Sequence, residues 1–319
     1  MDTHRATASL PWIDGPAVRA ALSPRAAVDA LEAALAAGLD PEADAPRTRV
    51  PTAAGQLLQM PSTRGTEVDT KLLTLTPDNP ERGLPVIQGV YVLFGAPGTP
   101  GQAPRAVLDG VELTGLRTSA VSTLGVRLLA DASPRHLVVF GTGVQAWEHA
   151  LTFQDVFGLE RVSVVGRDAD RAAALAARIE AELGVTASTA DSEAVAEADV
   201  VVTCTAATAP LFDGTLVPEH ATVVAMGSHT TDARETDDAL ARRATVAVES
   251  RDSAAREAGD VTLAIDSGAL AGIEDTVTLA ELVAGTARRR EGAPALFVTT
   301  GMPWQDLVVA SAVAREVLG

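Results

Sequence analysis

Lys71 is the residue whose type most directly suggests chemistry, because it is the only lysine among the 25 Lys and Arg residues of the chain. Arginine keeps its charge, whereas the pKa of a lysine ammonium falls on burial, so that a lysine can transfer a proton near neutral pH. The apolar neighbours Val68, Leu72 and Leu73 predict a strand that enters the interior. We interpret Lys71 as a candidate catalytic residue. The alternative, a stray surface lysine, is disfavoured because the chain has no other.

A glycine-rich turn suggests a second kind of chemistry. Residues 141–146 fit G-x-G-x-x-A, follow the apolar run 137–140 and open a predicted helix. The first glycine allows a tight turn, the second lets a pyrophosphate approach the backbone, and the small third residue lets helix pack on strand. The phosphates then lie at a helix N-terminus, where free N–H groups favour anions. The predicted cofactor-binding residues of this turn are Gly141, Gly143, Val144 and Gln145; a plain strand–turn–helix is the alternative.

The end of the next predicted strand bears on which dinucleotide binds. An NAD site places a carboxylate there for the ribose 2′-hydroxyl, whereas a 2′-phosphate is bound by arginine. Here the strand 162–165 runs into Gly166, Arg167 and Asp168, so the first position carries no side chain and an arginine follows it. Asp168 is better explained as the N-cap or first-turn acid of the following helix. Gly166 and Arg167 therefore favour NADP(H), with NAD(H) possible.

One helix and several short β-like runs make up the first part of the chain. Ser23 and Pro24 suit the N-cap and first position of a helix over 26–37, which Gly38 ends. Thr114 is expected to cap a later helix that continues to 129. Gly and Pro turns separate the β-like runs, which predict a small mixed sheet. These runs are 56–60, 68–75, 86–94 and 106–108.

From His136 onwards the pattern is that of a doubly wound domain. Apolar strands alternate with helices of 10–15 residues, which indicates parallel βαβ units. A last helix is predicted over 303–318. The fold class is therefore α/β, with a Rossmann-type doubly wound domain and a smaller α+β domain. The predicted strands of the large domain are 137–140, 162–165, 199–203, 222–226, 245–248 and 296–298, and its first helices are 147–157 and 168–183.

Composition and charge exclude several classes of partner. The net charge of −17 argues against nucleic acid and against an anionic membrane surface, because both require a positive face. Residues 1–10 lack the apolar core of a secretion signal, and no stretch approaches the length of a membrane span. The single Cys204 fits a reducing compartment, so we expect a cytoplasmic protein. The run 288–290 is expected to be a solvated helix end, and no metal site is predicted.

Short motifs in order along almost the whole chain give it a resemblance to the ornithine cyclodeaminase/mu-crystallin family. The resemblance implies homodimers in which a small domain, here 1–124 with 302–319, holds the substrate and the subunit contact. A Rossmann domain, here 125–301, would hold NAD(P). The motifs are Arg47-Thr48, Met60-Pro61, Lys71, Asn79-Pro80, Gly83-Leu84-Pro85, Leu108-Asp109-Gly110, Leu113-Thr114, Arg117-Thr118 with Ala120, 141–146, Met226-Gly227, 257–260 and Gly301.

The family resemblance also implies hydride transfer at the Cα–N bond of an amino or imino acid. Arg47, Lys71 and Arg117 would then hold the substrate carboxylate, which an arginine fork binds with two hydrogen bonds. Lys71 would also be a candidate proton donor, and Met60 would lie at the substrate. The residues expected against the cofactor are Arg117, Thr118, Gln145, Thr205, Gly227 and Thr299.

Two departures from the family pattern bear on the substrate. Where the cyclodeaminases place a catalytic aspartate after Met226-Gly227, this chain has His229, which can still exchange protons near neutral pH. Where they place an acid just ahead of Met60, this chain has Leu57, Leu58 and Gln59. A leucine cannot pair an ammonium, and an unpaired charge in a pocket is costly. Ornithine is therefore disfavoured as substrate.

The sequence leaves three functions open. An NAD(P)H-dependent oxidoreductase acting on an imino or amino acid is the first, with Lys71 and His229 as catalytic residues. A cyclodeaminase for ornithine or a related diamino acid is the second. A binding protein of the mu-crystallin kind, which holds NADPH without turnover, is the third; it gives little reason for a lysine to persist at position 71.

Overall fold

The protein, seen in a computed structural model, is described over residues 9–96, 98 and 101–319 and consists of two compact units. The first unit is made of Met1–Ser23, Asp44–Thr114 and Pro303–Gly319, and the second of Pro24–Ala43 and Gly115–Met302. The division between 114 and 115 lies inside a helix, ten residues before the boundary predicted at 124. Residues 24–43 group with the second unit. Most of the N-terminal segment examined for a secretion signal lies outside the described residues.

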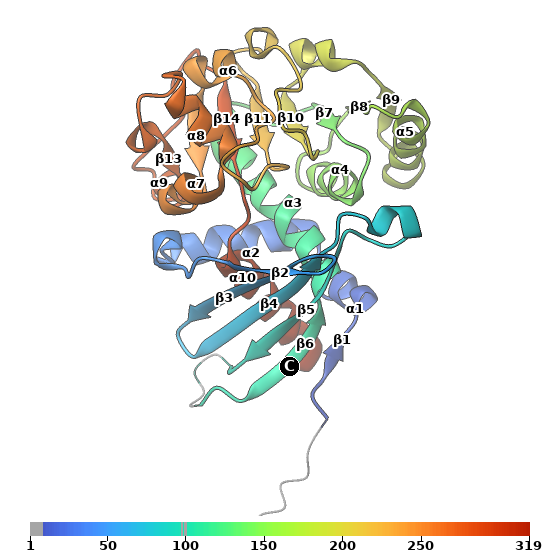
Figure 1. Cartoon of the computed structure of the whole chain (residues 1–319), viewed down its shortest axis with the longest axis vertical. Coiled ribbons are helices and arrows are strands. Elements are labelled where there is room, and N and C mark those ends of the chain that lie inside the picture. The colour runs from blue at the N-terminus through green and yellow to red at the C-terminus, as the bar shows by residue number, and fades with distance from the viewer. Residues whose placement is uncertain (1–8, 97, 99–100) are drawn as a thin grey trace, which may run out of the picture. The chain divides into compact units, whose positions relative to one another are not determined.

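The first unit is built on the mixed sheet that the sequence predicts (Figure 1). Its strand order is β1-β6-β5-β4-β3-β2, antiparallel except for the parallel pair of β1 and β6. The short strands β1 and β2 were not predicted. The strands are β1 Trp12–Ile13, β2 Thr48–Thr52, β3 Gly55–Arg64, β4 Glu67–Leu75, β5 Ile87–Phe94 and β6 Pro104–Asp109; the helices are α1 Gly15–Ala21, α10 Pro303–Leu318 and the 3₁₀ turn η2 Asn79–Arg82.

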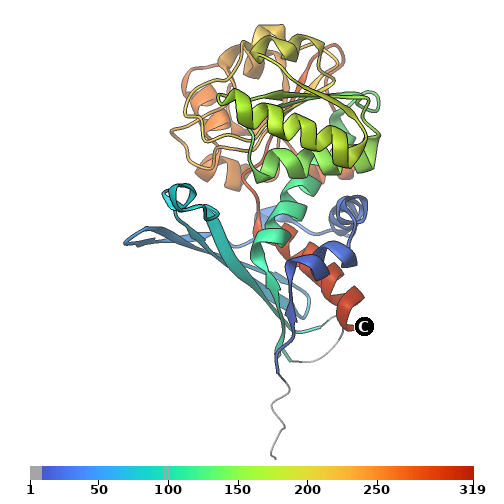
Figure 2. The ribbon, with the colours of Figure 1, turned by 90° about the vertical axis from the view of Figure 1, so that its right-hand side faces the viewer.

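Helix α10 covers one face of this sheet and packs on β3, β4 and β5. Figure 2 shows α1 and α10 on the same side of the sheet, and no described α-helix of this unit on the other side. Because side chains alternate along a strand, every second residue of β4 points toward the helix. Four of these residues, from Glu67 to Leu73, are buried, whereas the intervening ones are half-exposed or exposed. The buried set begins Glu67, Asp69, Lys71, so three charged residues in succession face the covered side.

Helix α3, Gly110–Leu129, begins one turn earlier than predicted. Asp109 is its cap, since its Oδ1 accepts hydrogen bonds from the amides of Val111 and Glu112 at 2.9 and 3.0 Å. Thr114 lies in the second turn, where its hydroxyl donates to the carbonyl of Gly110. The prediction of Thr114 as the cap was wrong because an aspartate five residues closer to the strand satisfies the free amides first.

The second unit has the doubly wound architecture predicted, so the fold class is confirmed. Its eight strands are all parallel, in the order β13-β12-β14-β11-β10-β7-β8-β9. Helices α4 and α5 lie nearest the viewer in Figure 2. The strands are β7 His136–Phe140, β8 Arg161–Val165, β9 Thr186–Thr189, β10 Val200–Thr203, β11 Thr222–Ala225, β12 Thr245–Val248, β13 Val277–Thr278 and β14 Ala295–Val298.

The helices of the second unit begin and end largely as the sequence predicts. Helix α2, Pro24–Ala36, is followed by Gly38 at φ +88°, and α5 begins after the predicted N-cap Asp168. The remaining helices are α4 Val144–Phe157, α5 Ala169–Leu183, α6 Asp238–Arg243, α7 Arg251–Glu257, α8 Gly259–Asp266 and α9 Leu279–Val283, with 3₁₀ turns η1 Pro41–Ala43, η3 Ser192–Glu197, η4 Gly214–Leu216 and η5 Ile273–Asp275.

The core of the second unit lets α3 lie directly against β14. A Cβ at Gly125 would stand 2.3 Å from the ring of Phe297, so only glycine allows this approach. Both residues lie in the second unit, where Phe297 is fully buried. No helix among the described residues is long and apolar enough to cross a membrane.

Candidate active site

The turn at 141–146 has the geometry of a pyrophosphate cradle. Gly141 has φ +117°, and a Cβ there would lie 2.7 Å from the Cys204 carbonyl oxygen, so the turn requires glycine. Gly143 is the N-cap of α4, and no side chain caps the helix there. A Cβ at Gly143 would meet no atom within 4 Å. The helix N-terminus therefore offers free amides next to open space, which fits an anion.

Two further residues of the turn also fit a ligand-binding site. Val144 is 62 % exposed at the start of α4. Gln145 carries a buried Oε1 that has no hydrogen-bond partner among the described residues. A buried amide oxygen without a partner is costly, and a bound ligand with a donor group would satisfy it. The residues present thus fit a dinucleotide.

A cavity of about 700 Å³ opens beside this turn, at the carboxyl ends of β7, β8 and β10. In open parallel sheets, ligands bind at the edge formed by the carboxyl ends of the strands. The cavity brings together five predicted residues and several others. The cofactor residues predicted by name are Gly141, Gly166, Arg167 and Thr205, and Thr142 was predicted as part of the turn. The other lining residues include Asp168, Arg171, Ser192, Cys204 and Leu211.

The end of β8 has no room for a side chain at position 166. A Cβ on Gly166 would lie 2.7 Å from Thr142 Cγ2 and 3.3 Å from Ala172 Cβ. Asp168 is the N-cap of α5, and its Oδ1 accepts the amide of Arg171 at 3.1 Å. The carboxylate that would bind a ribose hydroxyl is thus missing at 166, while Arg167 and Arg171 both line the cavity.

The carboxyl ends of β10 and β11 are held together by Glu235, a fully buried residue that the sequence analysis missed. Its carboxylate accepts the amide and hydroxyl of Thr205 at 2.9 and 2.6 Å and the amide of Gly227 at 2.7 Å. A Cβ at Gly227 would stand 2.1 Å from the Thr205 carbonyl oxygen. Burial raises the pKa of Glu235 more than these hydrogen bonds lower it. The predicted cofactor residues Thr205 and Gly227 therefore lie side by side.

Arg117 lies against Gly301 within the second unit. Gly301 has φ +78°, and a Cβ there would lie 2.3 Å from Arg117 Nη1. Glu249 fixes this loop, since its carboxylate accepts the Thr299 hydroxyl at 2.6 Å and the Gly301 amide at 3.0 Å. Arg117 and Thr118 are both buried. The structure therefore brings Arg117 next to the end of β14, where the predicted residue Thr299 lies.

His229 lies half-buried in the loop after β11. The neighbouring Ser228 holds this loop, because its hydroxyl donates to the Ala233 carbonyl at 2.6 Å. Asp260 holds the far end of the loop by accepting the amides of Glu235 and Thr236. The motif at 257–260 thus has a structural role: a Cβ at Gly259 would stand 1.9 Å from the Ala233 carbonyl oxygen.

In the first unit, Lys71 is fully enclosed and ion-paired. Its Nζ lies 2.7 Å from Asp306 Oδ2 of α10, and both side chains are 0 % exposed. Met60 is the register partner of Lys71 on β3, and Leu58 lies two residues away on the same buried face. Position 58, where an acid would bind a substrate ammonium, is therefore apolar and points to the same side as the lysine.

Two more carboxylates share this buried face. Asp69 is 1 % exposed, and its Oδ1 accepts the Ser62 amide at 2.8 Å. Asp44 accepts the Trp304 amide at 2.7 Å and hydrogen-bonds to the side chain of Ser62. Burial raises the pKa of Asp44 to about 6. Burial, reinforced by the Asp306 charge, raises the pKa of Asp69 well above its ordinary value. One lysine thus lies among three carboxyl groups.

Arg47, predicted at the substrate carboxylate, lies half-buried immediately before β2. It belongs to the first unit with Met60 and Lys71, whereas Arg117 and His229 belong to the second. The structure therefore supports two groups of predicted residues, each within its own unit.

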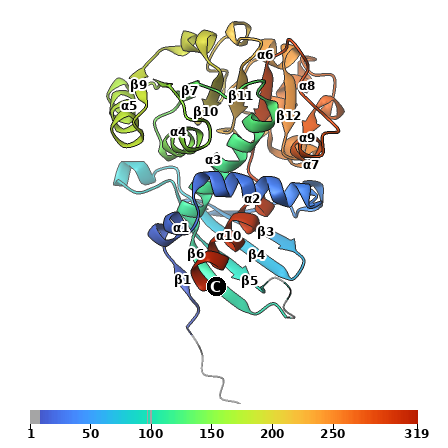
Figure 3. The same ribbon diagram turned by 180° about the vertical axis from the view of Figure 1, so that it is seen from behind.

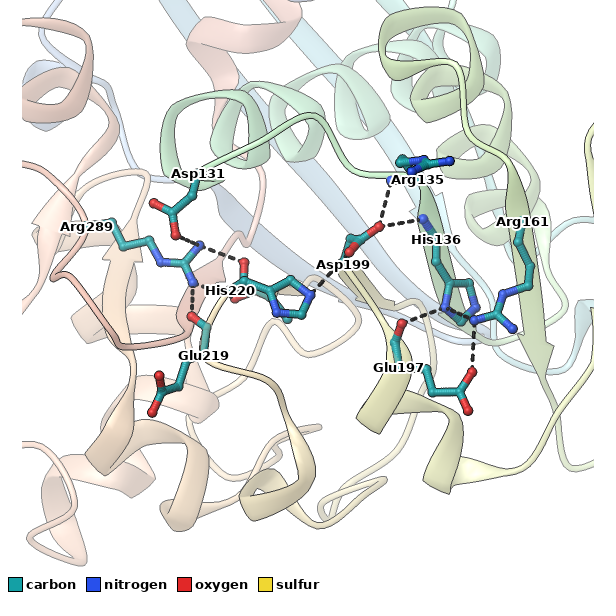
Figure 4. Close-up of polar contacts among 10 residues, drawn as sticks. Asp131, Arg135, His136, Arg161, Glu197, Asp199, Glu219, His220 and Arg289 are labelled. Carbon is teal, nitrogen blue, oxygen red and sulfur yellow. Dashed lines mark hydrogen bonds and ion pairs between the residues drawn. The ribbon is translucent and has the colours of Figure 1, made fainter.

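A separate polar cluster lies at the opposite edge of the large sheet, where the strands begin (Figure 4). Asp199 accepts the amides of Arg135 and His136 at 2.8 and 2.9 Å, and Arg289 donates to the carbonyls of Leu129 and His220. Arg289 is nearly buried and follows no helix directly, so the expectation of a solvated helix end at 288–290 was wrong for this residue. Its carbonyl partners explain why it is buried.

Asp44, Asp69 and Asp306 carried a weak signal that the sequence analysis did not use. Asp306 interrupts an otherwise apolar surface of the predicted helix 303–318, and Asp69 is two residues from Lys71 on a strand. Acids are almost never fully buried unless they are paired. A buried lysine therefore required a nearby acid, but the sequence alone could not bring α10 to β4.

Fold and site together define an oxidoreductase that uses a nicotinamide dinucleotide. The model of the ornithine cyclodeaminase/mu-crystallin family matches residues 16–319. Mouse ketimine reductase mu-crystallin is 34 % identical over 84 % of this chain and 83 % of its own length. Delta(1)-pyrroline-2-carboxylate reductase 2 of Burkholderia ambifaria is 36 % identical over 83 % of this chain and 81 % of its own.

Solved structures agree with these relatives. Thermococcus litoralis Delta(1)-pyrroline-2-carboxylate reductase, in complex with NADH and L-proline, superposes with a TM-score of 0.89 at 26 % identity, covering 97 % of this chain and 98 % of its own. An archaeal alanine dehydrogenase dimer with bound NAD has a TM-score of 0.86 at 26 % identity, with 97 % and 96 % covered. The chain belongs to the ornithine cyclodeaminase/mu-crystallin family and is an NAD(P)H-dependent imine reductase.

Proposed function

We propose that this enzyme reduces a cyclic 2-imino acid, such as Δ1-pyrroline-2-carboxylate or its six-membered homologue, to the corresponding cyclic amino acid with NADPH. The observation that carries the proposal is the position of Leu58 and Met60 beside Lys71. The lysine offers a proton and a positive charge, whereas the adjacent side chains offer only apolar contact. A cyclic imino acid has matching parts: an apolar ring, a carboxylate and a nitrogen that must gain a proton.

The cofactor, when bound, supplies the hydride that reduces the C=N carbon. On this proposal the free amides at the start of α4, with Gly141, Gly143, Val144 and Gln145, hold the pyrophosphate. Thr205, Gly227 and Thr299 line the carboxyl ends of the strands, and Arg117 and Thr118 contact the nicotinamide end. The hydroxyls of Thr205 and Thr299 donate hydrogen bonds to Glu235 and Glu249, so these two residues would shape the surface of the cofactor site without binding the cofactor through their hydroxyls.

The first unit is proposed as the substrate-binding unit. Within this unit Arg47 binds the carboxylate, because a guanidinium group matches its two oxygens. Lys71 delivers the proton to the imine nitrogen, and Asp306 keeps the ammonium oriented at 2.7 Å. His229 is proposed as a second acid/base group. A protein that only binds NADPH has no use for a buried lysine held by a buried acid, so this pair favours turnover.

NADP(H) is the proposed cofactor form. Gly166 cannot carry the carboxylate that recognises a free ribose hydroxyl, and Asp168 is occupied as a helix cap. Arg167 and Arg171 supply positive charge to the same cavity. A 2′-phosphate would interact favourably with both.

A homodimer is also proposed, formed through the uncovered face of the first unit's sheet. The pairing registers place Trp12, Val107, Val92, Thr70 and Pro61 in one row across five strands. Trp12 is 54 % exposed and the others are half-exposed. A mostly apolar row of this extent on a sheet face marks an interaction site, and the partner that fits is a second copy of the chain.

The direct test is to mix the enzyme with Δ1-pyrroline-2-carboxylate and follow the loss of NADPH absorbance, with proline identified as product by chromatography. We expect rapid reduction with NADPH and slower reduction with NADH. An open-chain control, pyruvate with ammonia, should react much more slowly because it lacks the ring. If the enzyme reduces no cyclic 2-imino acid, the proposed substrate class is wrong.

A further inference from the structure

The enclosure of Lys71 raises a question that its pairing with Asp306 does not answer. Reduction of C=N to CH–NH consumes one hydride, which carries two electrons from the reduced nicotinamide, and one proton. If Lys71 gives that proton, an N–H bond of its ammonium breaks and a neutral amine remains. Lys71 is 0 % exposed, so bulk water cannot reach it directly. A proton must return to its nitrogen before every new turnover.

A residue on the buried face of β4 is a candidate source of the proton that returns to Lys71. Asp69 and Lys71 are alternate residues of the strand, and alternate residues lie about 7 Å apart on one face. Asp306 is in contact with the lysine, and its charge acts on Asp69 more strongly than the charge of Lys71 does. Asp306 is therefore within electrostatic reach of both groups.

Asp69 has the hydrogen bonding of a carboxylic acid. Its Oδ1 accepts the Ser62 amide, whereas its buried Oδ2 has no hydrogen-bond partner among the described residues. A bare carboxylate oxygen in such a place is costly, and a proton on Oδ2 removes that cost. The raised pKa of Asp69 agrees with this. The groups that face it are Asp44 and Asp306, which favour the protonated form, and Lys71, which opposes it.

Asp44 shares a hydrogen-bonding partner, Ser62, with Asp69. It is only half-buried, and it hydrogen-bonds to the side chain of Ser62, whose amide is bonded to Asp69. Its pKa of about 6 lets it both take and give a proton near neutral pH.

We propose that Asp69 is a buried proton store that recharges Lys71 through Asp306 and is itself refilled from solvent by way of Asp44. The O–H bond of Asp69 breaks, Asp306 accepts the proton and passes it to Nζ, and the proton that refills Asp69 comes from solvent. No electrons move in these steps. Asp69 is a positioning residue in this scheme, because it acts only through Lys71. The proposal rests on the proposed function, in which Lys71 is the proton donor.

The test compares one turnover with many in Asp69→Asn. The asparagine oxygen can still accept the Ser62 amide, but the side chain holds no transferable proton. With enzyme in excess over Δ1-pyrroline-2-carboxylate, the proton already on Lys71 suffices, so NADPH should be oxidised at the wild-type rate. With substrate in excess, we expect a burst of one NADPH per site and then a steady rate at least about tenfold lower. A larger solvent deuterium isotope effect should accompany only the steady phase.

Glu67→Gln is the matched control. Glu67 lies on the same buried face of β4, next to Asp69, but its carboxylate lies 3.7 Å from Arg105 Nη1. It should show wild-type rates in both experiments. An equal slowing of the first and later turnovers by Asp69→Asn would overturn the proposal, because it would indicate a distorted site. Wild-type steady rates would overturn it too.

A second measurement does not depend on turnover. At neutral pH, the infrared spectrum of wild-type protein should contain the carbonyl band of a protonated carboxyl group that is missing from Asp69→Asn. Its absence from wild type would overturn the proposal. If wild type shows the band but reduces no imine, the proposed function fails while the protonated state of Asp69 stands.

Discussion

In the proposed mechanism Lys71 is the proton donor, and its ion pair with Asp306 orients the ammonium group. An arginine at position 71 would keep the charge beside Asp306 but could not release a proton. We therefore expect Lys71→Arg to lower kcat by about 10²–10⁴-fold, with the Kd of NADPH unchanged in calorimetry. Arg49→Lys, a charge-preserving swap on β2, is the control and should keep wild-type kcat. A raised KM with unchanged kcat in Lys71→Arg would instead make Lys71 a carboxylate clamp.

At the cofactor cavity, Arg167 is the residue that should separate the two dinucleotides. Arg167→Ala removes a charge-assisted contact with a 2′-phosphate, so NADPH binding should weaken by about 1–3 kcal/mol while NADH binding barely changes. Calorimetric titrations with both cofactors measure this. Arg178→Ala, in helix α5 and outside the cavity, should affect neither. Tighter binding of NADH than NADPH by wild type would refute the preference.

Single residues show what sequence reasoning can and cannot reach. The isolated lysine, the glycine turn and the cap Asp168 were readable because each combines a residue type with local spacing. Asp69, Asp306 and Glu235 were not, because their roles depend on contacts between segments far apart in the chain. Asp306 meets Lys71 only when α10 packs on the sheet, and Glu235 meets Thr205 and Gly227 only when β10 and β11 lie side by side.

At the scale of elements, the contact of α10 with the first unit's sheet brings acids together and makes stability depend on pH. The pKa of Asp44 is about 6 in the folded protein, above the ordinary 3.8. The folded state therefore binds the proton more tightly, and this stabilising contribution is complete below about pH 4 and lost as pH rises through about 6. Burial of Asp69 acts in the same direction.

Asp44→Asn should reduce this pH dependence. The asparagine oxygen can still accept the Trp304 amide, but it cannot ionise. We expect the variant to exceed wild type in free energy of unfolding by about 1–2 kcal/mol near pH 7 and to match it near pH 4. Urea unfolding at the two pH values measures the difference. Asp78→Asn, which replaces an exposed acid of the same unit, is the control and should show the wild-type dependence of unfolding free energy on pH. If Asp44→Asn also shows the wild-type dependence, the prediction is wrong.

Strands and helices were predicted well where their patterns were long. The alternating run of β4 and the apolar runs of β7 and β10 were found, whereas β1, β2 and β9 are too short or too exposed to carry a clear pattern. The start of α3 was misplaced because Asp109 ends a strand and caps a helix at once. Such a double role is visible only when the strand's end is known.

For the whole molecule, the apolar position 58 predicts which substrates fail. Cyclodeamination of ornithine needs an anion near the side-chain amine, and Leu58 supplies none. We expect no ammonia and no proline from ornithine with NAD, as measured by an ammonia assay and chromatography. Stoichiometric proline formation from ornithine would contradict this. The same preparation should reduce Δ1-pyrroline-2-carboxylate, which serves as the positive control.

The open face of the small sheet predicts the oligomeric state. Val92→Arg places a charge in the middle of the apolar row, so it should convert a dimer into monomers in sedimentation velocity. Leu84→Arg, at an exposed position in the turn after β4, should remain dimeric. If the wild-type protein sediments as a monomer, the homodimer proposal is wrong.

The position of α10 in the chain has a consequence for synthesis on the ribosome. Every strand of the small sheet leaves the ribosome long before Pro303–Leu318 does, whereas the second unit's strands are complete by residue 298 (Figure 3). A chain truncated before 303 and released from the ribosome should therefore contain a protease-resistant second unit and a first unit that is still digested. Until α10 arrives, Lys71 has neither its acid nor its cover. The proposed proton donor is thus completed only when α10 has been made.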